Sequence, residues 1–154
     1  MRQVIKLSTD QIRLISLFQN ITKATARDCL DDEKQNKIIF VVSEGKMGLA
    51  IGKGGSNIKS LKNIIKRDVE LIEYFDDPIK FLKNILNPKF VNEIKLDVKP
   101  DGSSQATIIV DHGKKGLVVG REGRKAERAR LFAKKYFDIS SVLINSPAVT
   151  QLEM

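Results

Sequence analysis

The sequence is poor in the residues that build disulfide bonds and transition-metal sites. It has one cysteine, Cys29, and one histidine, His112, among 154 residues. A single thiol excludes an internal disulfide and fits a reducing compartment. One cysteine and one histidine, far apart in the chain, also fall short of a transition-metal site. We therefore expect no metal and no cofactor, with Cys29 packed in a strand and His112 at the surface.

Long hydrophobic runs are also missing. No stretch approaches the roughly 18 apolar residues of a membrane helix, and the segment around Arg2 and Lys6 lacks the pattern of a signal peptide. We therefore expect no membrane contact and a cytoplasmic location. Tryptophan is absent and aromatic residues make up 6% of the chain, which argues against a sheet that stacks bases on aromatic rings.

Catalytic motifs are missing as well. The nearest approach to a phosphate-binding P-loop is GLAIGKG from Gly48, which is one residue too short and lacks the hydroxyl that binds magnesium. No set of serine, histidine and aspartate, and no pair of carboxylates, recurs in the sequence repeat described next. We therefore expect a protein that is not an enzyme.

What the chain does contain is one segment twice. GKMGLAIGKGGSNIKSL begins at Gly45, and GKKGLVVGREGRKAERA begins 68 residues later at Gly113. Six positions of the pair are identical, including the glycines that bound two loops, residues 52–55 (the first loop) and residues 120–123 (the second loop). At the same shift, residues 69–74 fall over residues 137–142. This period is too long for a solenoid unit, so we predict two copies of one small domain.

Positive charge collects around the two loops. The chain has 27 lysines and arginines against 19 acidic residues, a net charge of +8. Residues 45–67 hold six basic residues and no acid, and residues 113–135 hold nine basic residues and two acids, so these windows carry +13 and the remainder −5. Clustering at the same place in both copies indicates a polyanion as partner. A merely solvated charged surface is the alternative.

Hydrophobic periodicity predicts the same order of elements in both copies. The first copy is predicted to have a helix over 9–23 capped at Ser8, strands over 25–30 and 37–42, helices over 46–51 and 56–66, and a strand over 69–75. The second is predicted to have a helix from Asp77-Pro78 to 87, strands over 91–99 and 105–110, helices over 114–119 and 124–136, and a strand over 139–144. An additional edge strand is predicted over 4–7. The fold class is α+β, with the order α-β-β-α-α-β and a three-stranded sheet that packs helices on one face.

A helix, a Gly-x-x-Gly loop and a second helix form an anion site for physical reasons. Glycine lets the backbone leave the first helix in a conformation that suits no Cβ. The following helix presents unpaired N–H groups and a partial positive charge. Lys53 and Arg121 add full charges in the loops, and Ile51, Val119 and Ile58 border them with apolar surface. Phosphates would meet a polar loop beside an apolar wall for bases.

Several stretches resemble the archaeal NusA-type transcription factors, which carry tandem type II KH domains. They are EGKMGLAIGKGG from Glu44, VGREG from Val119, the DDP junction at Asp76 and FDI from Phe137. The resemblance implies KH domains over residues 1–75 and 76–146, followed by a tail over 147–154. It also implies that each GXXG loop clamps the backbone of about four nucleotides of single-stranded RNA. The sequence departs from an ideal anion site at Glu122, a carboxylate within the second loop.

The candidate RNA-binding residues are the two loops, the apolar residues beside them and the nearby cations. They are Lys46, Ile51, Gly52, Lys53, Gly54, Gly55, Ile58 and Lys59 in the first copy, and Lys114, Val119, Gly120, Arg121, Glu122, Gly123, Arg124, Lys125 and Arg128 in the second. The cations would supply charge, and the apolar groove would place the bases, because phosphate contacts alone do not read sequence.

Two functions remain after catalysis is set aside. The leading hypothesis is a single-stranded RNA-binding factor of transcription elongation, acting in termination or antitermination. The alternative is a ribosome-associated or ribosome-assembly scaffold built from KH folds, which the slightly acidic remainder of the chain favours. Single-stranded RNA is the expected partner of a monomeric protein. RNA polymerase and the ribosome both stay open as further partners.

Overall fold

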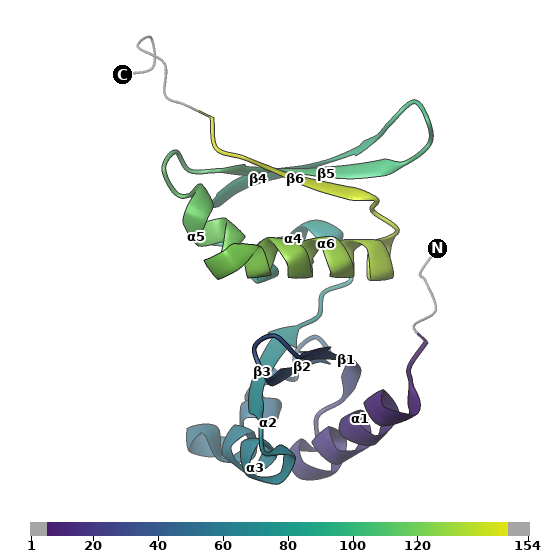
Figure 1. Cartoon of the computed structure of the whole chain (residues 1–154), viewed down its shortest axis with the longest axis vertical. Coiled ribbons are helices and arrows are strands. Elements are labelled where there is room, and N and C mark those ends of the chain that lie inside the picture. Colours follow the sequence, from purple (N-terminus) through teal and green to yellow (C-terminus); the bar gives the residue numbers. More distant parts are fainter. Residues whose placement is uncertain (1–5, 148–154) are drawn as a thin grey trace. The chain divides into compact units, whose positions relative to one another are not determined.

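The structure is a computed structural model in which residues 6–147 are described. These residues form two compact units, one ending at Phe75 and the other beginning at Asp76. Each unit has the element order α-β-β-α-α-β, and each has its helices on one face of its sheet (Figure 1). The predicted α+β fold class and the predicted order of elements are confirmed.

The first unit contains four helices, counting a short 3-10 turn, and three strands among its described residues. They are α1 (Thr9–Thr22), β1 (Ala26–Asp32), β2 (Lys37–Val42), α2 (Met47–Ile51), η1 (Lys53–Gly55), α3 (Ser56–Ile65) and β3 (Asp68–Glu73). The second unit repeats them. Its elements are α4 (Pro78–Ile85), β4 (Val91–Val98), β5 (Ser104–Val110), α5 (Lys115–Val119), η2 (Arg121–Gly123), α6 (Arg124–Phe137) and β6 (Ser141–Asn145).

Both sheets have the same topology. In the first sheet β2 is central, antiparallel to β1 and parallel to β3, and in the second β5 is central, antiparallel to β4 and parallel to β6. Two parallel strands need a long crossover between them. Here that crossover is the helix–loop–helix segment that carries the glycine loop. The loop is therefore built into the connection between the second and third strands of each unit.

The helices α1 and α4 begin where the sequence predicts. The Ser8 hydroxyl accepts a hydrogen bond from the Gln11 backbone N–H, and the Gln11 side chain accepts one from the Ser8 N–H, which forms a capping box for α1. The Asp77 carboxylate accepts from the Ile79 N–H at 2.9 Å and caps α4. Pro78 follows at the first helical position, where its missing N–H leaves no bond unmade.

Aromatic side chains form the centre of the packing in each unit. Phe18 of α1 stacks on Phe40 of β2 with 4.6 Å between ring centroids, and both are fully buried. In the second unit Phe81 of α4 lies 6.1 Å from Phe132 of α6, which stacks on Tyr136 at 5.3 Å. Burial of apolar surface is the main favourable term in folding, and such rings bury large areas each.

The single cysteine lies in a strand, as predicted. Cys29 belongs to β1 and is 2% exposed, so its thiol is enclosed by the core of the first unit. None of the helices within residues 6–147 has both the length and the apolar character needed to span a bilayer.

The two central strands differ in their burial. The apolar stretch Ile38 to Val42 of β2 is buried on both faces of the sheet. β5 alternates instead, with Ala106, Ile108 and Val110 buried and the intervening side chains half-buried. Alternation of this kind is typical of a strand that has its core on one side only.

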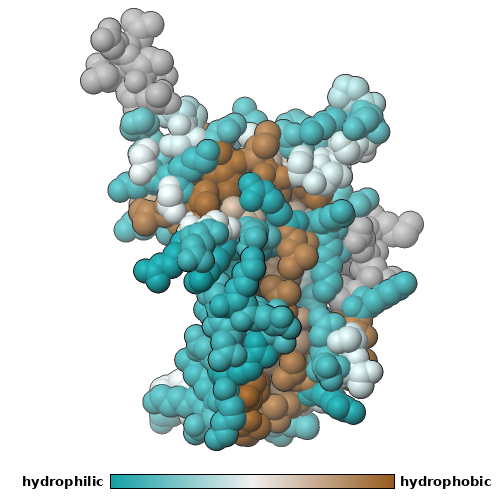
Figure 2. Space-filling view, viewed as in Figure 1, coloured by the Kyte–Doolittle hydropathy of each residue, from teal (hydrophilic) through white to brown (hydrophobic). Residues whose placement is uncertain are grey.

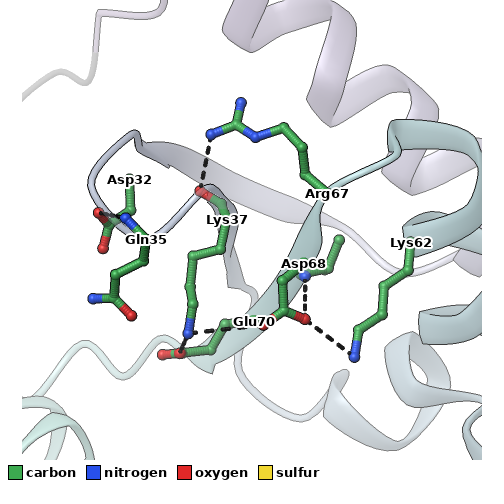
Figure 3. A network of polar contacts seen from close by, with 8 residues as sticks. Asp32, Gln35, Lys37, Lys62, Arg67, Asp68 and Glu70 are labelled. Atoms are coloured by element: carbon green, nitrogen blue, oxygen red, sulfur yellow. Dashed lines mark hydrogen bonds and ion pairs between the residues drawn. The ribbon is translucent and has the colours of Figure 1, made fainter.

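Charged side chains link the starts of β2 and β3 to each other and to α3 (Figure 3). Lys37 forms an ion pair with Glu70 at 3.1 Å, and Lys62 of α3 forms one with Asp68 at 3.2 Å. The hydrogen bond from Lys62 lowers the pKa of the Asp68 carboxyl, and a hydrogen bond from Arg67 lowers the pKa of Asp31.

Two predictions about the segments are wrong. The predicted edge strand over 4–7 lies partly outside the described residues, and Lys6 and Leu7 precede α1 without forming a strand. The alignment of residues 69–74 with 137–142 is also wrong, because α6 has 14 residues and α3 has 10. Asp68 begins β3 and Ser141 begins β6, each opposite the first residues of the central strand, so the shift there is 73 residues. Other predicted boundaries differ by at most two residues.

Candidate nucleic-acid interface

The first loop begins where α2 ends at Gly52. This residue has φ 77° and ψ 167°, a conformation that is essentially restricted to glycine. A Cβ added there would lie 2.8 Å from Cγ of Asn57 and 2.9 Å from the Ser56 hydroxyl oxygen. Both the backbone angles and the space therefore require glycine at this position.

The rest of the first loop turns the chain into α3. Gly54 and Gly55 have φ values of 63° and 77°, and the Gly55 N–H donates to the Gly52 carbonyl at 3.1 Å. The N–H groups of Lys53 and Gly54 precede this first bond of the turn, and both residues are exposed. An anion at the loop would meet these donors together with the positive end of α3.

Asn57 supports the first loop, and the sequence reasoning missed it. Its Nδ2 donates a hydrogen bond to the Leu49 carbonyl at 2.9 Å and so joins the start of α3 to α2. The signal was present in the repeat, because the second copy has Lys125 at this position where the first has an amide. A short polar side chain directly after a glycine loop is suited to such a local backbone bond.

The second loop has the same backbone. Gly120 has φ 84° and ψ 168°, Gly123 has φ 73°, and the Gly123 N–H donates to the Gly120 carbonyl at 3.1 Å. A Cβ on Gly120 would lie 2.9 Å from Cγ of Lys125 and 3.1 Å from its backbone nitrogen. The two loops therefore match in conformation although two of their four residues differ.

Glu122 is the main chemical difference between the loops. It adopts φ 57° and ψ 26°, close to the 63° and 20° of Gly54, in the left-handed region that favours glycine. Its Oε2 accepts a hydrogen bond from Nη2 of Arg124 at 3.2 Å, and the side chain is 72% exposed. A cation at the start of α6 is thus paired within the protein.

The structure places the predicted site residues on the short helix, the loop and the following helix of each unit. Exposed residues are Lys46, Lys53, Gly54, Lys59, Lys114, Arg121 and Glu122. Half-buried residues are Ile51, Gly52, Gly55, Ile58, Val119, Gly120, Gly123, Arg124, Lys125 and Arg128. α2 packs on α3 and α5 packs on α6, so each set is brought together within its own unit. Lys114 also faces another group, because its Nζ lies 5.5 Å from the centroid of the Phe90 ring.

Two exposed leucines add apolar surface that the prediction did not include. Leu49 of α2 and Leu117 of α5 occupy equivalent positions and are 47% and 52% exposed. They are among the large hydrophobic side chains that remain exposed to water. The face of the molecule drawn in Figure 2 is mostly hydrophilic. The signal in the sequence was their identity in both copies, which core packing does not require of an exposed side chain.

The helices that follow the loops differ in charge. α6 carries six basic residues and one acid, whereas α3 carries two lysines and no acid. One of those lysines, Lys62, is held by Asp68 at the far end of the helix. The second unit therefore offers a polyanion far more positive charge along its helix than the first.

The remaining titratable candidates do not form a further centre. His112 is exposed just after β5, as predicted, and its Nδ1 lies 3.3 Å from the Pro147 carbonyl oxygen. Within residues 6–147 no group of three or more histidine, cysteine, aspartate or glutamate side chains is arranged to hold a metal ion.

Comparison with known proteins gives consistent matches. Residues 12–101 match the family described as KH domain. The chain is 36% identical over 138 residues to the "Probable transcription termination protein NusA" of Halobacterium salinarum, covering 90% of this chain and 96% of that protein. It is 37% identical over 126 residues to the protein of the same name from Methanococcus vannielii, covering 81% and 70%. A solved structure described as "Crystal structure of APE1850" superposes with a TM-score of 0.78 at 36% identity and covers 90% of this chain and all of that one.

Proposed function

Because this chain belongs to the archaeal NusA-type family of KH-domain proteins, we propose that it binds single-stranded RNA and acts in transcription termination or antitermination. One observation supports this most strongly. Two glycine loops share one backbone conformation, and each delivers its N–H groups at the start of a helix beside basic side chains. Neither loop holds a constellation of catalytic groups, so the proposed role is binding without turnover.

The proposed contacts divide between the RNA backbone and the bases. Phosphates meet the loop N–H groups and the cations Lys53, Arg121 and Arg128, because backbone donors at a helix start and full positive charges both favour anions. Bases contact the apolar border of each loop, to which the exposed Leu49 and Leu117 contribute. Phosphate contacts would set the register of the strand, and base contacts would select its sequence.

The direct test replaces the first loop's middle residues. In the Lys53→Asp, Gly54→Asp double variant, two carboxylates stand where phosphates are proposed to bind, and aspartate tolerates the left-handed angle of Gly54. We expect RNA affinity to fall at least tenfold, since each lost charge-assisted contact is worth roughly 1.5–3 kcal/mol. Fluorescence anisotropy with a single-stranded oligoribonucleotide measures it, and circular dichroism on heating checks that the variant folds. Unchanged affinity in a folded variant would remove the first loop from the proposed site.

A salt series supplies a second measure of the same contacts. Binding to single strands should weaken with a log–log slope of about −0.7 for each phosphate neutralised. The aspartate variant should show a shallower slope than the wild-type chain. Equal slopes would mean that the lost affinity did not come from phosphate contacts.

The partner beyond RNA separates this proposal from a ribosomal scaffold. A termination or antitermination factor should be recovered with RNA polymerase and nascent transcripts, and should change the yield of terminated product when it is added to a transcription reaction. The Lys53→Asp, Gly54→Asp variant is the control for that reaction. Recovery with ribosomal particles instead would favour the scaffold role, and sedimentation of the purified chain tests the expected monomer. The proposal also implies a cytoplasmic location, which cell fractionation tests.

A further inference from the structure

Glu122 occupies the one loop position where the two copies differ in charge. It is also the position where only one copy has glycine at a left-handed φ. The matching residue of the first loop is Gly54, which has nearly the same φ and ψ and open space around its Cα. Glycine builds this turn without strain, whereas a side chain at φ 57° is in a sparsely populated region. The carboxylate is therefore not needed to form the turn. Its contribution is sought in the ligand that it can bind or repel.

The carboxylate acts against a phosphate in two ways. It stands between the Arg121 and Arg124 side chains in sequence, directly at the loop N–H groups, and repels an approaching anion. It also engages the Arg124 guanidinium at 3.2 Å, so that a phosphate must compete for that cation. The first loop has neither obstacle, because Gly54 carries no side chain. The second loop is thus less favourable for a strand that offers phosphates alone.

A ligand that binds beside an ionised carboxylate must supply a hydrogen-bond donor, because the carboxylate only accepts. Phosphate groups of a nucleic-acid backbone have no donor. The donors of a single strand are the ribose 2′-hydroxyl and the N–H groups of the bases. Base N–H groups occur in DNA as well as in RNA, whereas the 2′-hydroxyl belongs to the RNA backbone that such a loop clamps. We infer that Glu122 is a specificity-determining residue: the second loop admits an RNA strand by accepting a hydrogen bond from a ribose 2′-hydroxyl, and discriminates against DNA, which lacks it. This inference rests on the proposed RNA-binding function.

Without a ligand, the Glu122 carboxylate is paired with Arg124. Since the ion pair is open to solvent at Glu122 and is therefore weak, a hydroxyl that approaches Glu122 can replace the half-buried Arg124 as its partner. Arg124 is then released toward the neighbouring phosphate. A donor and a phosphate together satisfy both side chains, whereas a phosphate alone leaves Glu122 without a partner and next to a like charge.

The test compares three ligands of one sequence, each about 12 nucleotides long. This length exceeds the roughly four nucleotides that one such loop holds. The ligands are RNA, 2′-O-methyl RNA and DNA, each measured by anisotropy with the full chain. Glu122→Gly removes the carboxylate and relaxes the turn, and Glu122→Gln removes the charge alone. Glu127→Gln on the exposed side of α6 is the matched control, because it removes the same charge one turn away.

For Glu122→Gly we expect DNA affinity to rise roughly twofold to fivefold, the scale of an exposed charge interaction, with a smaller rise for RNA. The RNA-to-DNA affinity ratio should therefore fall, while Glu127→Gln should leave that ratio near the wild-type value. Placing the carboxylate in the first loop, as Gly54→Glu, should increase the ratio. 2′-O-methyl RNA should behave like DNA, because the methyl group removes the hydroxyl donor. If it binds like RNA, the 2′-hydroxyl is not the donor and the inference is overturned.

Failure of this inference differs from failure of the proposed function. A wild-type chain that binds RNA, with a ratio that Glu122→Gly and Gly54→Glu leave unchanged, overturns the role of Glu122 and keeps the function. A wild-type chain that binds none of the three ligands at low salt overturns both. Thermal unfolding of each variant shows that any change in ratio comes from a folded protein.

Discussion

The two units place different chemical groups on the same backbone. In the first unit, Gly54 leaves the loop open and Asn57 ties it to α2. In the second, Glu122 takes the position of Gly54, Lys125 takes the position of Asn57, and α6 contains six basic residues. The glycines that open and close each loop are required by the turn, so they agree between the copies. The positions that the turn does not constrain are where the copies can diverge in binding.

The largest expected effect comes from the glycine that opens each loop. Gly52→Ala and Gly120→Ala force a Cβ into a conformation and a space that exclude it, and each should lower the free energy of unfolding by about 1–3 kcal/mol. Gly120→Ala should cost more, because one of its close neighbours is the Lys125 backbone nitrogen at 3.1 Å, which cannot rotate away. Urea denaturation of the full chain measures both.

Gly54→Ala is the control for this pair. No heavy atom lies within 4 Å of its added Cβ, so only the left-handed angle opposes it and the cost should be about 1 kcal/mol. If Gly54→Ala destabilised the chain as much as Gly52→Ala, the space around Gly52 would not matter and only backbone angle would distinguish glycine there.

A smaller effect is expected from the amide that supports only the first loop. Asn57→Asp keeps the shape but loses the donor to the Leu49 carbonyl, and should lower stability by about 1 kcal/mol, the net worth of a typical hydrogen bond. Hydrogen exchange at residues 52–55 should quicken at the same time. The reciprocal Lys125→Asn change in the second unit should slow exchange at residues 120–123, and no change there would mean that the amide alone does not order a loop.

The smallest effect concerns pH. The folded-state pKa values of Asp31 and Asp68 lie below the usual 3.8, because Arg67 and Lys62 donate hydrogen bonds to them. Their contribution is complete above the unfolded value and is lost as pH falls through the folded one. Both carboxyls are largely exposed, so we expect each to add no more than about 0.5 kcal/mol.

The second unit supplies the neutral comparison for this effect. Ser141 stands where the first unit has Asp68, and its hydroxyl lies 3.4 Å from the Gln105 amide oxygen. Stability measured from pH 6 to pH 3 should therefore fall less steeply in Asp68→Asn than in the wild-type chain, while Ser141→Ala should leave the slope unchanged. Parallel curves for Asp68→Asn and wild type would show that the Lys62 pair contributes nothing.

Sequence reasoning recovered the features that depend on short-range rules. The glycine spacing predicted both loops, Asp77-Pro78 predicted the start of α4, and Ser8 was predicted to cap α1. The shift of the last strand was missed, because the length of α6 is set by packing of Phe132 and Tyr136 far from the identical glycines. A repeat aligned on its loops carries no information about how far the next helix continues.

The polar contacts at the loops were harder to predict for a different reason. Asn57 and Arg124 are both hydrophilic residues in a basic segment, and either could have faced water. Their partners, the Leu49 carbonyl and the Glu122 carboxylate, are fixed by dihedral angles that spacing alone does not give. The assignment of the seventeen candidate residues to RNA stays a prediction until binding is measured.

The position of each glycine loop between two parallel strands has a consequence for folding kinetics. The third strand can dock on the central one only after the intervening helix–loop–helix has closed, and contacts between segments distant in sequence form slowly. Loop glycines would then be needed in the transition state as well as in the native protein, and their replacement should slow refolding in addition to hastening unfolding. The four residues of each loop would then determine both how fast the protein folds and which ligand it binds.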